Sequence, residues 1–157
     1  WLFSMNNSLS YKGFELSVFL QGIAGNKIYN ANNIDNTGMA AAYNQTTDVL
    51  KRWQGEGTSN SMPRAVFGDP NQNTRVSDRF VENGSYLRLK NITLSYTFPK
   101  QWLQKAQIEN ARLSLSCENV ATITGYSGFD PEVGINGIDQ NRYPISRTFS
   151  LGLNFNF

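Results

Sequence analysis

The end of the chain alternates strictly between apolar and polar side chains and stops at the aromatic residue Phe157. Alternation with a period of two predicts a β-strand that presents one apolar and one polar face. The apolar face of this segment carries Phe149, Leu151, Leu153, Phe155 and Phe157. No apolar run approaches the roughly 18 residues that a transmembrane helix needs, so a chain of this kind meets a membrane only as strands.

Four further segments show the same alternation, and together the five predict an all-β, antiparallel fold. The predicted strands cover residues 1–11, 14–22, 85–98, 110–120 and 147–157. Short links at 12–13 and 99–109 alternate with two long irregular regions at 22–84 and 121–146, and a helical turn is expected near 47–53. Loops of that length argue against an ordinary compact domain.

Composition excludes several classes of function. The net charge is +2 and the basic residues form no stripe, which argues against a nucleic-acid partner. Without histidine, and with Cys117 as the lone cysteine, the chain offers neither a Cys/His zinc site nor a Ser/His/Asp triad. We therefore expect no enzyme activity and no cofactor.

The polar faces of the strands favour a membrane barrel over a soluble sheet. They carry mainly Ser, Asn, Thr and Gly, whereas soluble sheets are usually coated with Lys and Glu. Each segment has about ten residues, which matches the roughly 9 to 11 that a tilted strand needs to cross a bilayer. Five strands cannot close a barrel, so the chain is expected to be part of a larger one.

Connection lengths predict the orientation of the strands. The short links 12–13 and 99–109 fall on one side, expected to be periplasmic, and the loops 22–84 and 121–146 fall on the extracellular side. Strict alternation carries Arg88 and Lys90 onto the apolar face near the extracellular end, while Glu15, Arg112 and Glu118 face the lumen, where inter-strand ion pairing is the simpler role. Six aromatic residues gather at the short-link end and predict an interfacial girdle: Tyr11, Phe14, Tyr96, Phe98, Phe155 and Phe157.

Several stretches, in order along the chain, resemble SusC/RagA-type TonB-dependent transporters of Bacteroidota. The longest is Asn-Gly-Ser-Tyr-Leu-Arg-Leu-Lys-Asn-Ile-Thr-Leu-Ser-Tyr-Thr-Phe-Pro at 83–99. The others lie at 11–16, 25–30, 52–53, 63–64, 128–133, 143–144, 147–149 and 152–157. The resemblance covers essentially the whole chain.

This resemblance implies an outer-membrane barrel of about 22 strands around an N-terminal plug. It further implies a SusD-like surface lipoprotein as a lid, energy supplied through TonB, and oligosaccharides or peptides as imported nutrients. The chain would form the C-terminal part of that barrel, with the plug, the TonB box and the earlier strands missing from it. Outer-membrane lipid and the barrel-assembly machinery would be its further partners.

Four loop aromatics are candidates for contact with substrate or with the lid, although packing is the common role of such residues: Trp53, Tyr126, Phe129 and Tyr143. The terminal Phe157 is a candidate assembly signal that pairs with the assembly machinery by strand addition. The full set of signal and girdle candidates is Phe149, Phe155, Phe157, Tyr96, Phe98, Tyr11 and Phe14. The carboxylates of Asp130 and Glu132 suggest a loop turn before they suggest a calcium site.

Two other functions remain open at the level of sequence. A soluble β-sandwich that binds carbohydrate would show the same alternation, because its strands also have one apolar face. The chain could also be a barrel fragment held as a client of outer-membrane assembly or secretion machinery.

Overall fold

The computed structural model describes residues 1–157, which form two compact units. The first, here called the sheet unit, comprises Trp1–Asn26, Gly84–Gly125 and Pro144–Phe157. The second, here called the loop unit, comprises Lys27–Asn83 and Tyr126–Tyr143. Each unit is built from segments that are far apart in the sequence, so neither is a simple excursion of one stretch of chain.

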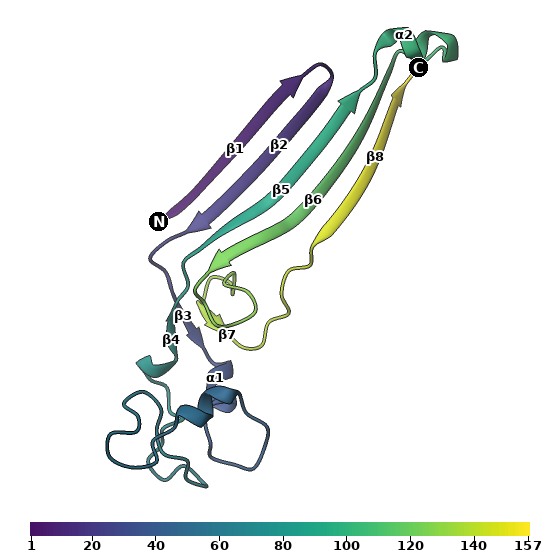
Figure 1. Ribbon diagram of the computed structural model, residues 1–157. Coiled ribbons are helices and arrows are strands. Elements are labelled where there is room, and N and C mark those ends of the chain that lie inside the picture. The colour runs from purple at the N-terminus through teal and green to yellow at the C-terminus, as the bar shows by residue number, and fades with distance from the viewer. The chain divides into compact units, whose positions relative to one another are not determined.

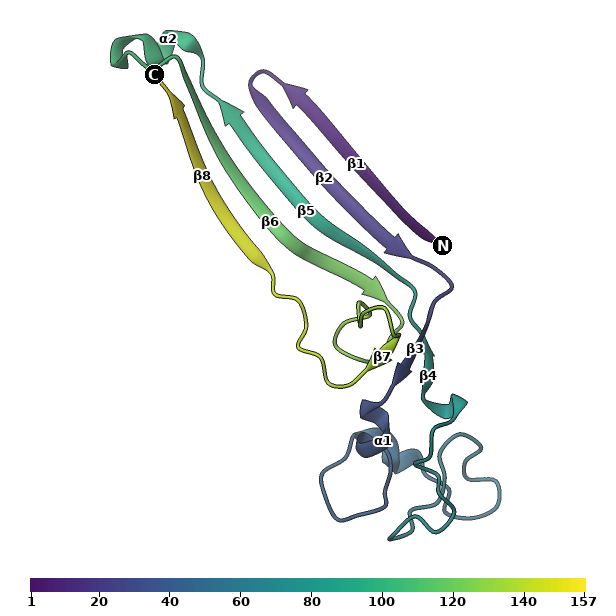
Figure 2. The ribbon, with the colours of Figure 1, turned by 180° about the vertical axis from the view of Figure 1, so that it is seen from behind.

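The sheet unit is a single antiparallel sheet of five strands in the order β1-β2-β5-β6-β8 (Figure 1). The strands are β1 (Leu2–Tyr11), β2 (Phe14–Ile23), β5 (Tyr86–Thr97), β6 (Asn110–Thr124) and β8 (Thr148–Asn156). They lie where alternation predicts strands, except that β6 continues four residues beyond its expected end at 120. Figure 2 shows the same strands side by side from behind.

A two-residue turn joins β1 to β2. Tyr11 pairs with Phe14, and the two residues between them, Lys12 and Gly13, have φ angles of 46° and 87°. Two successive positive φ angles define a type I′ turn, whose twist matches that of the flanking strands. A Cβ atom at Gly13 would also lie 2.9 Å from the carbonyl oxygen of Thr97, so the neighbouring strand favours glycine as well.

A bulge changes which side chains share a face in the middle of the sheet. The pairing of β5 with β6 shifts between Leu89 and Asn91, and the pairing of β2 shifts beside it, between Phe19 and Leu20. The extra residue Lys90 reverses the alternation, because one inserted residue moves the rest of the strand to the opposite face. Asn119, in the same region of β6, has a positive φ of 52°.

The bulge corrects the sequence-based expectation for Arg88. Strict alternation predicts Arg88 on the apolar face, but the observed register pairs it with Gln21 and Thr122 on the polar face. Its Nε donates a hydrogen bond of 2.8 Å to Thr122 Oγ1, and its guanidinium lies over the Tyr86 ring. The side chain is only 3% exposed. Leu87 and Leu89 take the apolar positions instead.

The apolar face of the sheet lies open. Leu9, Phe14, Leu94, Leu115 and Leu151, one from each strand, are all exposed. A β-sandwich would need a second sheet packed on this face. The sheet unit contains only one sheet, so the sandwich alternative finds no support in it.

The loop unit is organised around a small sheet in the order β4-β3-β7. Its strands are β3 (Lys27–Asn30), β4 (Val81–Asn83) and β7 (Ile138–Asp139), with β3 antiparallel to β4 and parallel to β7. Ile28 and Phe80 are its largest fully buried side chains. Alternation misses these strands because they are too short to display a period.

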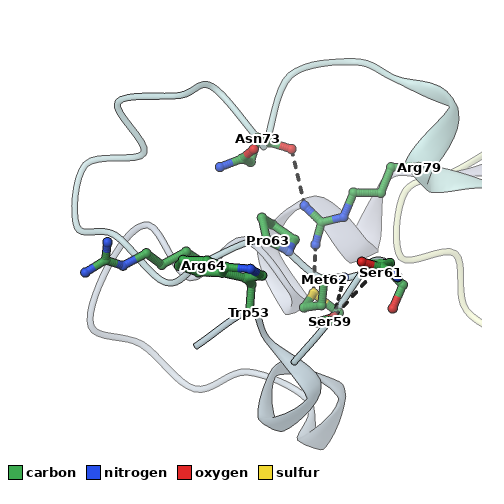
Figure 3. Close-up of a pocket in the computed structure, with 9 residues that line it drawn as sticks. Trp53, Ser59, Ser61, Met62, Pro63, Arg64, Asn73 and Arg79 are labelled. Carbon is green, nitrogen blue, oxygen red and sulfur yellow. Dashed lines mark hydrogen bonds between the residues drawn. The ribbon is translucent and has the colours of Figure 1, made fainter. Parts of the chain in front are cut away.

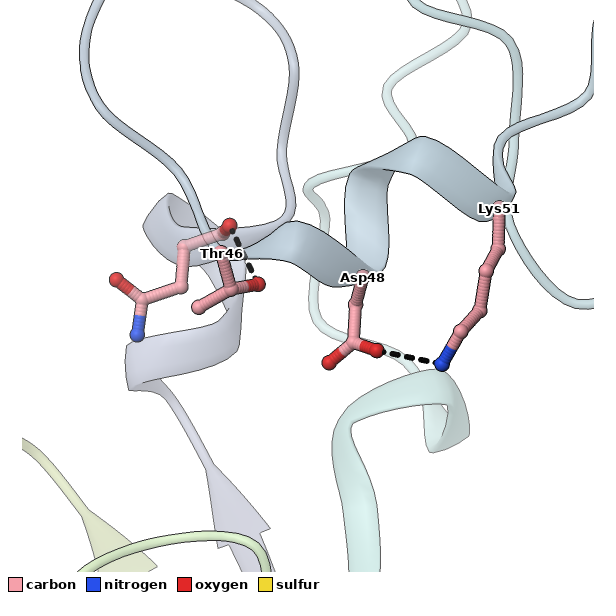
Figure 4. Close-up of polar contacts among 4 residues, drawn as sticks. Thr46, Asp48 and Lys51 are labelled. Carbon is pink, nitrogen blue, oxygen red and sulfur yellow. Dashed lines mark hydrogen bonds and ion pairs between the residues drawn. The ribbon is translucent and has the colours of Figure 1, made fainter.

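Short helices complete the loop unit: α1 (Asn32–Asn36) and the 3₁₀ helices η1 (Thr47–Lys51) and η2 (Asp78–Phe80). η1 occupies the site of the expected helical turn. Figure 4 shows two polar contacts of η1: a 2.7 Å ion pair between Lys51 and Asp48 inside the helix, and a 3.3 Å hydrogen bond that Oγ1 of its N-cap residue Thr46 donates to the Asn36 carbonyl oxygen. The sheet unit adds α2 (Lys100–Leu103) and the 3₁₀ helix η3 (Gln104–Ala106) between β5 and β6.

None of the helices is long and apolar enough to span a membrane.

Candidate functional site

The short-link end of the sheet carries a continuous row of aromatic rings. The ring centroids of Phe14 and Tyr96 are 4.5 Å apart, those of Tyr96 and Phe98 are 5.1 Å apart, and those of Phe98 and Trp102 are 6.4 Å apart. Such spacings allow favourable edge-to-face and tilted contacts. The sequence predicts the first three members. It misses Trp102, because this residue lies on α2, outside the alternating segments.

The other members of the predicted girdle set lie outside the four rings of this row. Tyr11 pairs with Phe14 in the first hairpin, and Phe155 pairs with Ala111 on β6. Phe149 pairs with Cys117, six residues from Phe155 along β8. At about 3.3 Å per residue this separates the two by roughly 20 Å, so Phe149 lies apart from the aromatic row. The roles of these residues as girdle and as assembly signal stay predictions.

The polar face of the sheet holds an ion pair that crosses three strands. Arg112 Nη2 on β6 lies 2.7 Å from Glu15 Oε2 on β2, and it donates a 3.0 Å hydrogen bond to Ser95 Oγ on the intervening strand. Ser95 is buried beneath this pair. Inter-strand pairing is the role that alternation predicts for Glu15 and Arg112. Both side chains are partly exposed, so the pair contributes at most ~1 kcal/mol to stability.

The loop unit contains an open pocket with a volume of about 410 Å³. Figure 3 shows Trp53 and Arg64 on one side of it and Arg79 on another. The walls also include Ser59, Asn60, Ser61, Met62, Pro63 and Asn73. The lining includes two arginines, several neutral hydrogen-bonding groups and no carboxylate. This chemistry suits a neutral or anionic polar ligand with a face that can stack on an indole ring.

Arg79 holds the walls of this pocket together. Its guanidinium donates hydrogen bonds to the Asn73 carbonyl oxygen at 3.3 Å and to both oxygens of Thr37 at 3.2 Å, and it contacts Met62 Sδ at 3.0 Å. Burial lowers the pKa of this guanidinium, and the negative charge of Asp69 opposes that effect. One side chain thus joins three loop segments. Sequence reasoning misses it, because an arginine within an irregular loop carries no pattern.

Asp69 fixes the loop that presents Asn73 to the pocket. Its carboxylate accepts hydrogen bonds from the backbone N–H of Asn73 at 2.9 Å and from the backbone N–H and the hydroxyl of Thr74 at 2.8 and 2.7 Å. Burial alone raises the pKa of the Asp69 carboxyl, but these hydrogen bonds outweigh burial and lower the pKa. The carboxylate form therefore stabilises this turn.

Glu82 is the centre of a second polar cluster in the loop unit. Its Oε1 accepts hydrogen bonds from Asn30 Nδ2 at 2.9 Å, Asn33 Nδ2 at 3.0 Å and Ser127 Oγ at 2.7 Å, and its Oε2 accepts one from Ser127 N at 3.0 Å. These donors come from β3, α1 and the segment after Gly125. The cluster ties the two long irregular regions of the sequence to each other.

The four loop candidates fall into three groups: one lines the pocket, two are exposed outside it, and one is buried. Trp53 lines the pocket at 37% exposure, while Phe129 and Tyr143 are 80% and 83% exposed and lie outside its lining. Tyr126 is only 6% exposed, and its hydroxyl donates a 2.6 Å hydrogen bond to Asp139. Burial, that hydrogen bond and the nearby negative charges raise the pKa of Tyr126. A packing role fits Tyr126, and contact with substrate or lid stays a prediction for all four.

The Asp130-Pro131-Glu132 stretch forms a turn. Asp130 Oδ1 accepts a 2.9 Å hydrogen bond from the backbone N–H of Glu132, the local arrangement that Asp favours in turns. No group of three or more His, Cys, Asp or Glu side chains is arranged to hold a metal ion.

Known proteins are similar to this chain in sequence and in fold. No protein-family model matches it. The chain is 35% identical to TonB-dependent receptor P3 of Formosa agariphila, over 97% of its own length, and 32% identical to TonB-dependent receptor SusC of Bacteroides thetaiotaomicron, over 99%. It covers only 16% and 15% of those receptors.

Solved structures agree with the sequence matches. In the structure of the RagAB peptide importer in the open-open state, one chain superposes on 99% of this protein with a TM-score of 0.84 and 29% identity. The closed-closed state gives a TM-score of 0.82 over 98% of the chain. This protein covers 17% of the matched chain in each state.

The fold and the matches together define an outer-membrane protein of the Bacteroidota, built mainly of antiparallel strands. The sheet is open, so no barrel is closed within these residues. More specifically, the chain belongs to the SusC/RagA type of TonB-dependent receptors, and it spans about one sixth of the length of its relatives. These relatives are named as receptors and importers, not as enzymes.

Proposed function

We propose that this chain forms part of the wall and the outer loops of a TonB-dependent importer of nutrients. The observation that carries this proposal is the five-stranded sheet, which has an exposed apolar face, a polar opposite face and a close match to the RagAB peptide importer. The apolar face would contact lipid and the polar face would line the lumen. A non-enzymatic role follows from this assignment.

A closed barrel would complete the open edges of the sheet. Backbone groups left unpaired in hydrocarbon are costly, so β1 and β8 each require a neighbouring strand in the membrane. A barrel of about 22 strands, expected from the family resemblance, would supply them. The links 12–13 and 99–109 would then be periplasmic, and the regions 22–84 and 121–146 extracellular.

The loop unit would handle substrate on the extracellular side. Its pocket combines the indole of Trp53 with Arg64, Arg79 and neutral polar groups, which suits oligosaccharides or peptides. Phe129 and Tyr143 are exposed enough to contact a SusD-like lipoprotein lid. TonB would act through the plug of the full-length receptor. Recognition of Phe157 by the barrel-assembly machinery stays a prediction. The alternative that the chain is a client of outer-membrane assembly or secretion machinery also stays a prediction.

The proposal is tested by placing an arginine on either face of β8 in the full-length receptor. Leu151→Arg puts a charge on the apolar face, whereas Ser150→Arg puts the same charge one residue away on the polar face. Arginine on a lipid-facing site costs about 2 to 4 kcal/mol near the bilayer midplane. We expect Leu151→Arg to lower the amount of receptor in the outer membrane and Ser150→Arg to leave it nearly unchanged.

The same strains report on import. A deletion strain that carries the wild-type receptor or Ser150→Arg should take up labelled oligosaccharides or peptides in a TonB-dependent way, and a strain that carries Leu151→Arg should not. Equal outer-membrane levels of the two variants would contradict the assignment of the faces. Failure of the wild-type receptor to import either substrate class would contradict the importer itself.

A further inference from the structure

The link between β5 and β6 is an ordered cap at the short-link end of the sheet. α2 begins directly after Pro99, and η3 follows α2 without a break. The backbone N–H of Trp102 donates to the Pro99 carbonyl oxygen at 3.0 Å, and the N–H of Ile108 donates to the Leu103 carbonyl oxygen at 3.4 Å. Gln107, with a φ of 55°, turns the chain back into β6.

An open pocket of about 660 Å³ lies between this cap and the ends of β5 and β6. Its lining has three kinds of side chain. Two are apolar, Phe98 and Ile108, and two carry opposite charges, Lys100 and Glu109. The others are neutral hydrogen-bonding groups, Thr97, Gln104 and Asn110. A pocket with one positive and one negative group complements a ligand that also carries one charge of each sign.

The pocket lies where a bilayer interface is expected. Phe98 lines it and also belongs to the aromatic row, and the Phe98 ring lies 6.4 Å from that of Trp102, which is 65% exposed. Exposed tryptophan next to an apolar sheet is typical of the boundary between hydrocarbon and headgroups. The molecules available there in quantity are phospholipids, whose headgroups carry a phosphate and, in part, an amine.

We propose that this pocket binds the phosphoethanolamine headgroup of a phospholipid. Lys100 pairs with the phosphate, Glu109 pairs with the ammonium group, and the amides and hydroxyl of the lining accept or donate the remaining hydrogen bonds. Phe98 and Ile108 contact the glycerol and the first methylenes. The inference rests on the membrane location in the proposed function and adds a lipid site to it.

The charges distinguish this headgroup from its common alternatives. Phosphatidylcholine has a quaternary ammonium with no N–H to donate to Glu109, and phosphatidylglycerol has no positive charge to pair with it. Phosphatidylethanolamine offers both a phosphate and an N–H donor. The pocket should therefore prefer it over the other two.

The test uses the full-length receptor in nanodiscs made from equal amounts of the three phospholipids. After partial delipidation, mass spectrometry measures how much of each lipid remains bound per receptor. Wild-type receptor should retain phosphatidylethanolamine above its share of the bilayer. Lys100→Gln should reduce retention of phosphatidylethanolamine and phosphatidylglycerol alike, by about two- to fivefold, the effect of one partly exposed ion pair.

Glu109→Gln should reduce retention of phosphatidylethanolamine by a similar factor and leave phosphatidylglycerol unchanged. Lys105→Gln is the matched control, since it removes the same charge from the same cap outside the pocket lining. Lys100→Arg keeps the charge and should behave like the wild type. Heat-dependent gel mobility checks that each variant is folded.

Three results would overturn the site: no preference for phosphatidylethanolamine in the wild type, an equal loss with Lys105→Gln, or an equal loss of both lipids with Glu109→Gln. A receptor that enters nanodiscs without a headgroup preference contradicts only this inference. A receptor that does not enter them contradicts the proposed function as well.

Discussion

Single polar side chains hold the loop unit together where its apolar core is small. The carboxylate of Glu82 accepts four hydrogen bonds from three separate segments, and the guanidinium of Arg79 contacts Thr37, Met62 and Asn73. Asn30, one of the donors to Glu82, is almost fully buried. A buried amide that loses its partner keeps the full cost of its desolvation. The sequence predicts neither residue, because the segments that each of them joins come together only in the folded chain.

Replacing Glu82 by alanine is expected to loosen the loop unit. The change removes the acceptor of the Asn33 amide and of both Ser127 donors, and one of the two acceptors of the Asn30 amide, at a cost of about 1 to 3 kcal/mol. Hydrogen exchange in the full-length receptor should show faster exchange in β3, β4 and the segment after Gly125. Glu56→Ala, at an exposed site of the same unit, is the control. Equal protection in the two variants would refute the role of Glu82.

At the scale of single elements, alternation predicts the five long strands but fails at one residue. Lys90 is an extra residue in β5, and it sends Arg88 to the polar face. The sequence does not reveal this, since Arg88, Lys90 and Ile92 keep the same parity whether or not a bulge lies between them. The sequence also does not reveal β3, β4 and β7, which are too short to display a period and whose pairing joins residues about 50 to 110 positions apart.

Placing an arginine at Leu89 tests the bulge directly. Because Lys90 is an extra residue, Leu89 lies on the apolar face, and Leu89→Arg turns a charge toward lipid. The expected loss of stability is about 1 to 4 kcal/mol, depending on how deep residue 89 lies in the bilayer. Urea titration of the full-length receptor in micelles, followed by heat-dependent gel mobility, measures it. Lys90→Ala retains the bulge and should unfold near the wild-type midpoint. Strict alternation would place residue 89 on the polar face, so coincident unfolding of both variants would show that the bulge does not control the faces.

At the scale of the whole chain, the two units meet different demands. The sheet unit exposes large apolar side chains on every strand. The loop unit buries Ile28 and Phe80, and hydrogen bonds between polar groups connect its segments. The sequence predicts the first unit well because a lipid-facing strand must repeat its pattern over its full length. It predicts the candidate pocket only through Trp53, because Arg79 and Asn73 reach that pocket by way of irregular backbone.

The exposed apolar face predicts how the receptor behaves in solution. Purified full-length receptor should be monodisperse and rich in β-structure in detergent micelles, and it should aggregate when the detergent is diluted below its micellar concentration. Size-exclusion chromatography and circular dichroism follow both states, and return of the monodisperse peak after addition of amphiphilic polymer is the control. A folded, monodisperse receptor in plain buffer would be incompatible with the membrane assignment.

The contacts between the two sequence segments of the loop unit have a consequence for the evolution of these receptors. Residues 27–83 and 126–143 are separated by two strands, yet Glu82 and Asn30 on one side bind Ser127 on the other. Recombination that exchanged only one of these loops between related receptors would separate matched partners. The two stretches should therefore pass from one receptor to another as a pair, and diversification of such receptors should proceed by joint replacement.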